Sequence, residues 1–140
     1  MTTASPWSQW IVEDKITSLH QEGIKRHGGK SGTAKNGCVS GALGAAYHAE
    51  LYSAPEDASG YVAGLAFASY LLFYLITNHC YVDGNKRVSW TSCMEVLLQL
   101  GLTIDASDEE AHGFCESMAN GTIKKSEQVV AWIAEHLKAI

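Results

Sequence analysis

The chain has 140 residues, 46% of them hydrophobic and 18% charged, which is typical of a globular protein rather than a disordered one. This length predicts a single domain over residues 1–140, with enough chain to bury a core. The net charge of −5 argues against general nucleic-acid binding, because there is no surplus of cations to displace counterions from phosphates.

The N-terminal third predicts a helix, a polar loop and a second helix. Residues 1–6 lack the basic region and apolar run of a signal peptide, so we expect a cytoplasmic protein. Ser5 and Pro6 suit a helix start, and apolar residues follow at helical spacing. The glycine-rich residues 28–37 predict a loop that lacks P-loop spacing, and residues 39–51 predict an alanine-rich helix.

A nearly continuous apolar segment, Tyr61–Thr77, lies in the middle of the chain. It is at the lower limit for a membrane span of roughly 17–25 residues, but it contains tyrosines and a glycine and has no basic flank. A helix that is apolar all round is equally typical of the centre of a bundle, and we favour that interpretation, with no membrane partner. Ser53 and Glu56 resemble a capping box at the start of this helix, which continues to Asn78.

The remainder predicts three more helices. The first runs over residues 85–100, with Trp90 on its core face, and Gly101 ends it. Ser107 and Glu110 have the spacing of a capping box at the start of the second. No strand pattern of useful length appears, so we predict an all-α fold, a compact bundle of about six helices around the apolar one. The last helix is expected to present Val129, Val130, Ile133, Leu137 and Ile140.

The four cysteines are Cys38, Cys80, Cys93 and Cys115. They are widely scattered and show no C-x-x-C spacing, so we predict reduced thiols, mostly in the core, rather than disulfides or zinc ligands.

The stretch His79–Arg87 (HCYVDGNKR) joins the apolar helix to the next one and is rich in polar residues. Gly84 makes the backbone flexible at this point, and Asn85 lies where the next helix should begin. The free N–H groups and the dipole of a helix start can hold an anion. Lys86 and Arg87 add positive charge that suits phosphate. Residues 84–87 therefore predict an anion pocket.

Two other residues of this stretch supply the chemistry of group transfer. His79 can take a proton near neutral pH, and Asp83 offers a hard oxygen ligand suited to Mg²⁺. A structural interpretation explains each residue alone, with Asp83 as a helix N-cap, His79 as a helix-end histidine, and Lys86 and Arg87 as solvated charges. Base, metal ligand, anion pocket and cations together favour phosphoryl or nucleotidyl transfer.

His79, Asp83, Gly84, Asn85 and Arg87 resemble the Fic motif, His-Pro-Phe-x-Asp/Glu-Gly-Asn-Gly-Arg. The stretch is most similar to the death-on-curing (Doc) branch of the Fic/Doc superfamily, in which Asn-Lys-Arg replaces Asn-Gly-Arg. The resemblance extends over residues 8–138 and implies a helical bundle in which the 28–37 loop is a flap that docks the target segment beside the active site.

The chain departs from the motif at four positions. Cys80 and Tyr81 replace Pro and Phe, which leaves the chemistry plausible. Lys86 replaces the second glycine, and Trp90 stands at the position of a second arginine in AMP-transferring members. These last departures argue against ordinary AMP transfer.

The resemblance implies a toxin of a toxin–antitoxin pair that moves phosphate from Mg²⁺-bound ATP to a hydroxyl of a target protein, with a translation elongation factor as the implied target. His79 would be the base, Asp83 the Mg²⁺ ligand, and Lys86 and Arg87 the groups that stabilise phosphate charge. The alternatives are AMP transfer (AMPylation) by the same site, and an inactive binding protein that keeps the fold.

A second short match concerns regulation. Ser18, Glu22 and Gly23 fit the Ser/Thr-x-x-x-Glu-Gly/Asn inhibitory motif of Fic proteins and their antitoxins. The Glu of that motif pairs with the second arginine, which this chain lacks. We therefore expect a separate antitoxin rather than self-inhibition.

Overall fold

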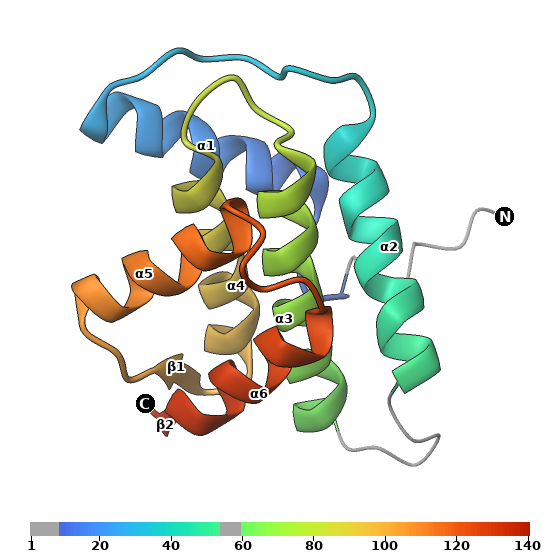
Figure 1. Ribbon diagram of the computed structural model, residues 1–140. Helices are drawn as coiled ribbons and strands as arrows, with labels where there is room; N and C mark the ends of the chain where they lie inside the picture. The colour runs from blue at the N-terminus through green and yellow to red at the C-terminus, as the bar shows by residue number, and fades with distance from the viewer. Residues whose placement is uncertain (1–8, 54–59) are drawn as a thin grey trace, which may run out of the picture.

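The computed structural model describes residues 9–53 and 60–140. Within these ranges the chain forms six helices and two short strands, so the predicted all-α class is confirmed (Figure 1). The helices are α1 (Glu13–His27), α2 (Cys38–Ser53), α3 (Gly60–Asn78), α4 (Asn85–Gln99), α5 (Asp108–Ala119) and α6 (Ser126–His136). The strands are β1 (Leu102–Ile104) and β2 (Leu137–Ala139), which pair antiparallel.

The apolar helix α3 is the centre of the bundle. It packs against α2, α4, α5 and α6, and Phe67, Leu71 and Leu72 on it are fully buried. Tyr61–Asn78 is long and apolar enough to cross a membrane by length and composition alone, yet 56% of this segment is buried inside the fold. This burial fits the predicted core helix.

The start of α1 differs from the prediction. The helix begins at Glu13 with Val12 as its N-cap, because the backbone at Val12 is extended. Ser5 and Pro6, the predicted start, lie outside the described residues. The predicted capping box before α3 also falls there, since Glu56 is not among the described residues and Ser53 is the last residue of α2.

The last helix is shorter than predicted. It ends at His136, and residues 137–139 turn into β2, where Leu137 pairs with Ile104. Val129 and Ile133 are buried as expected, whereas Ile140 is 75% exposed. A strand of three residues is too short to carry an alternating pattern, which explains why the sequence did not predict the sheet.

The prediction of four reduced thiols is wrong for one pair. Cys38 and Cys80 form a disulfide, with their Cα atoms 5.3 Å apart, that ties the start of α2 to the segment after α3. The two residues are 42 positions apart in sequence, so only the fold makes them neighbours. Cys93 and Cys115 are free and buried, as predicted.

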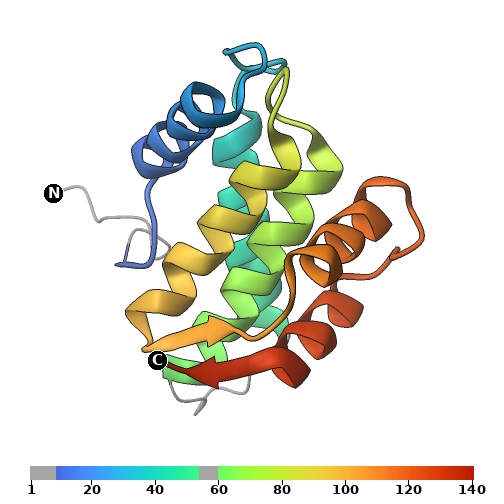
Figure 2. The ribbon, with the colours of Figure 1, turned by 90° about the vertical axis from the view of Figure 1, so that its left-hand side faces the viewer.

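The two ends of the bundle differ in character. Seen after a quarter turn, the small sheet lies at one end of α3 and α4, and the loops of residues 28–37 and 79–84 lie together at the other (Figure 2). The polar motif therefore lies at the same end of the bundle as the glycine-rich loop of residues 28–37.

Candidate active site

The segment between α3 and α4, residues 79–84, is termed the motif loop. It opens with His79, an exposed residue whose φ of 53° is left-handed. It closes with Gly84, which is the N-cap of α4 at a φ of 77° and makes no side-chain cap. Glycine adopts this conformation without strain. The interpretation of Asp83 as the helix N-cap is therefore wrong.

Asn85 holds the motif loop in shape. Its side chain is 7% exposed; Oδ1 accepts a hydrogen bond from the Tyr81 N–H at 2.9 Å, and Nδ2 donates to the Tyr81 carbonyl at 2.8 Å. Both ends of the amide are thus bonded to the backbone of Tyr81. The free N–H groups at the start of α4 are the groups suited to hold an anion.

The glycine-rich loop, here called the flap (residues 28–37), runs along the motif loop. Thr33 and Tyr81 form an isolated antiparallel bridge. The N–H of Lys30 donates to Asp83 Oδ2 at 2.8 Å. The flap therefore lies beside the site and fixes one oxygen of the predicted metal ligand.

Asp83 fits a magnesium ion of the kind that is shared with a substrate. Its carboxylate is exposed, and Oδ1 is not used by the Lys30 N–H. No cluster of three His, Cys, Asp or Glu side chains occurs among residues 9–53 and 60–140, so the protein offers no complete cage there. Mg²⁺ is commonly held by one or two carboxylates plus phosphate and water, which matches this donor set.

A cavity of about 610 Å³ opens beside the start of α4. One wall is formed by motif residues 83–87, which include the predicted anion-binding residues. The facing wall comes from α5, with Asp108, Ala111, His112 and Cys115. Sequence analysis did not predict the α5 wall, because its residues carry no motif and share a helix with core positions.

His79 lies at a second, smaller cavity of about 190 Å³. This smaller cavity shares residues 83–86 with the larger one, so the two cavities adjoin at the end of the motif loop and the start of α4. The predicted site residues are therefore brought together around one turn. Asp83, Gly84, Asn85 and Lys86 line both cavities, His79 borders the smaller one, and Arg87 borders the larger one.

Lys86 has a partner that the sequence did not reveal. Its Nζ lies 2.5 Å from Glu116 Oε2, which joins the start of α4 to α5. This hydrogen bond and the nearby charge lower the pKa of the Glu116 carboxyl from its usual value. Glu116 is therefore ionised at neutral pH, and the Lys86 ammonium is held at the boundary of the two cavities by one of its three donors.

Arg87 faces α1. A Cβ built on Gly23 would lie 3.2 Å from Arg87 Cδ, so this glycine allows the close approach. Glu22 of the inhibitory-motif match is exposed and pairs with Arg26 of its own helix at 2.8 Å. Glu22 is thus directed to its own helix rather than to the anion pocket.

The prediction that Trp90 is a core residue needs correction. The side chain is half-buried and lines the larger cavity. Its other side packs against the core, with the ring centroid 6.5 Å from that of Trp132 at 70°. The position of the family's second arginine is therefore occupied by an aromatic surface facing the cavity.

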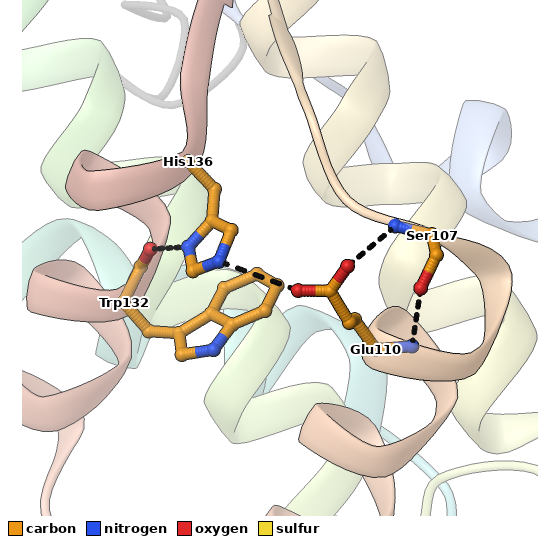
Figure 3. Close-up of polar contacts among 4 residues, drawn as sticks. All are labelled: Ser107, Glu110, Trp132 and His136. Atoms are coloured by element: carbon orange, nitrogen blue, oxygen red, sulfur yellow. Dashed lines mark hydrogen bonds and ion pairs between the residues drawn. The ribbon is translucent and has the colours of Figure 1, made fainter.

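The α5 wall is braced by α6 (Figure 3). Ser107 and Glu110 form the predicted capping box at the start of α5. His136 Nδ1 donates to the Trp132 carbonyl at 2.7 Å, and His136 Nε2 lies 3.9 Å from Glu110 Oε2. The Trp132 ring stacks between Phe114 and His136, with centroids 3.9 Å apart in both pairs. These side-chain contacts join α5 to α6.

The fold and site define a class: a helical bundle that presents a histidine, a carboxylate and a helix start around one turn. Residues 10–97 match the sequence profile of the Fic/DOC family. The match covers α1, α2, α3, the whole motif loop and α4 as far as Leu97, and the chain belongs to the Fic/DOC family. No curated protein matches the chain. Members of this family are typically transferases that use nucleotides to modify proteins, so the chain is a transferase of this general kind.

Proposed function

We propose that the protein transfers the terminal phosphate of Mg²⁺-bound ATP to a hydroxyl of a target protein. The carrying observation is that two cavities adjoin at residues 83–86, the turn predicted to bind an anion. The larger cavity is the place for the nucleotide, since Arg87 and the Trp90 ring border it. The smaller one, where His79 lies, is the place for the target hydroxyl.

The residues divide the reaction between them. The hydroxyl oxygen attacks the phosphorus, its proton passes to His79, and the bond to the nucleoside diphosphate breaks. Asp83 would hold Mg²⁺, which supplies charge for the phosphate oxygens. The N–H groups of residues 84–86, with Lys86 and Arg87, stabilise the same charge.

Phosphate transfer, rather than AMP transfer, is supported by two departures from the family motif. Lys86 fills the place of a glycine and is tied to Glu116. Trp90 presents a ring instead of a second arginine that would grip pyrophosphate. AMP transfer by the same site is the alternative, and an inactive binding protein is a third candidate. The intact His79, Asp83, Asn85 and Arg87 weigh against loss of activity.

We further propose the Doc-like role: a cytoplasmic toxin that acts on a translation elongation factor and is controlled by a separate antitoxin. This rests on the resemblance of the Asn-Lys-Arg run at residues 85–87 to that branch. The exposed flap fits the docking of a target segment, because the bridge between Thr33 and Tyr81 uses one edge of the flap backbone and leaves the other edge outward.

The deciding experiment is the mass added to target proteins when the purified chain is incubated with ATP, Mg²⁺ and a cell lysate. We expect phosphate adducts, lowered on the order of 10²–10⁴ in rate by His79→Ala. His79 is exposed, so this variant should unfold at the wild-type temperature. Lys86→Gly should also lower the rate. Adenylyl adducts alone would establish AMP transfer instead, and equal adducts from wild type and His79→Ala would remove the histidine from the reaction.

A further inference from the structure

His20 of α1 is a buried polar side chain directly beneath the motif loop. It is 4% exposed, and its Nε2 lies 2.7 Å from the backbone carbonyl oxygen of Asp83. The imidazole stacks on the Tyr81 ring, with centroids 3.8 Å apart and planes at 12°. A Cβ built on Gly84 would lie 3.6 Å from His20 Nε2. His20 thus contacts the motif loop at Tyr81 and Asp83 and lies close to Gly84.

We infer that His20 is a positioning residue for the motif loop, acting through the peptide between Asp83 and Gly84. This inference rests on the proposed function for its consequence in catalysis, but its geometry is independent of which group is transferred. His20 was not singled out by the sequence, because a lone histidine on an amphipathic helix has no distinguishing pattern.

The hydrogen bond fixes the direction of that peptide. A carbonyl oxygen only accepts, so Nε2 carries the proton and donates it. The C=O and N–H of a trans peptide point in opposite directions, and the chain has no cis bond in its described part. Anchoring the Asp83 carbonyl toward α1 therefore directs the Gly84 N–H away from α1.

The same anchor sets the place of the groups on either side. Asp83 precedes the anchored peptide, and its carboxylate is then held by the flap through Lys30. Gly84 follows it in the left-handed conformation from which α4 starts. Without the His20 bond, the Asp83 carbonyl loses its donor and the peptide can rotate, which would move the carboxylate and the first N–H groups of α4 together.

A role in packing alone makes a different prediction from a role in positioning. An apolar side chain of similar size would fill the space beneath Tyr81, whereas only a donor can hold the Asp83 carbonyl. Glutamine places an N–H donor at a reach similar to that of histidine Nε2. The pair His20→Leu and His20→Gln therefore separates the two roles, because both variants lose the ring stack on Tyr81.

The test measures Mg²⁺-dependent ATP binding by isothermal titration calorimetry, with the transfer rate and amide hydrogen exchange on the same proteins. For His20→Leu we expect affinity for Mg²⁺-ATP or the transfer rate to fall 10- to 100-fold, as for other groups that orient a metal ligand. Exchange at residues 81–85 should quicken. His20→Gln should restore most of all three readouts. Circular dichroism confirms that both variants are folded.

Two results would overturn the inference: equal losses in the leucine and glutamine variants, or wild-type behaviour of His20→Leu. If wild-type protein binds no Mg²⁺-ATP, the proposed function fails. Hydrogen exchange at residues 81–85 then decides the positioning role by itself, since it needs no ligand. Faster exchange in His20→Leu but not in His20→Gln supports the role, and unchanged exchange in both rejects it.

Discussion

Reduction of the Cys38–Cys80 disulfide should lower the free energy of unfolding by about 4 kcal/mol. The value follows from the 42-residue separation of the two cysteines, because a cross-link of that span removes loop-closure entropy from the unfolded chain. On the usual entropy of unfolding per residue, this corresponds to a fall in melting temperature on the order of 10 °C.

The assay is urea unfolding with and without a mild reductant, followed by tryptophan fluorescence. The other two thiols are protected while the protein is folded. Burial raises the pKa of Cys93 far above its usual value and that of Cys115 to about 12, so neither forms the reactive thiolate in the folded protein. Alkylation of the native protein should therefore label no cysteine before reduction and the partly exposed Cys38 after it, whereas the fully buried Cys80 should label only when the protein unfolds.

The matched control is Cys38→Ser, which removes one partner of the bridge and should make the unfolding midpoint insensitive to the reductant. An unchanged midpoint of the wild-type protein on reduction would refute the entropy argument. Four thiols counted in unreduced protein after denaturation would refute the disulfide itself and restore the expectation of reduced cysteines drawn from the sequence, whereas two are expected.

Three further outcomes are expected. Asp83→Asn should weaken Mg²⁺-dependent ATP binding in titrations. The melting temperature should stay nearly unchanged, because the Asn Oδ1 can still accept the hydrogen bond from the flap N–H. Equal titrations with and without Mg²⁺ for both proteins would contradict the metal role. Gly41→Ala, at an exposed helical position with open space around it, should raise the free energy of unfolding by about 0.5–1 kcal/mol. Gly64→Ala should give no such gain, because its Cβ would lie 2.5 Å from a Leu100 methyl. Equal gains for the two variants in denaturant melts would contradict this packing. Hydrogen bonds from Ser107 lower the pKa of Glu110 from its usual 4.5, so this carboxylate stabilises the fold above about pH 4.5, and its contribution is lost as pH falls through the lower folded-state pKa. Glu110→Gln should therefore reduce the change of the urea midpoint between pH 5 and pH 3. An unaltered pH profile would show that the cap does not titrate this way.

Local signals predicted most of the helical framework. The apolar run of α3, the glycine that opens α4 and the Ser107 capping box each act over a few neighbouring residues, so they are legible in one sequence. The start of α1 and the end of α6 were misplaced because no residue pattern marks them, and β2 forms only where β1 is already in place.

Long-range pairings were beyond the reach of the sequence. No local pattern around Glu116 predicts its contact with Lys86, which is 30 residues away, and none around Cys38 predicts its bond to Cys80. Trp90 was assigned to the core by its helical spacing, but the position is shared by core and cavity, which spacing cannot separate. The motif loop was predicted because its chemistry is concentrated in consecutive residues, whereas the α5 wall is spread over a helix.

The stacked column of Phe114, Trp132 and His136 makes the C-terminal helix a reporter on the site. No residue of α6 lines the large cavity, but α6 contacts α5, and residues of α5 line that cavity. By thermodynamic linkage, any compound that binds the docked arrangement of α5 more tightly than a detached one must also favour the docking of α6. Detaching α6 should lower the affinity of the cavity for such a compound by the same factor by which the compound favours the docking of α6. Occupancy of the cavity is therefore coupled to the order of a helix that never contacts its contents.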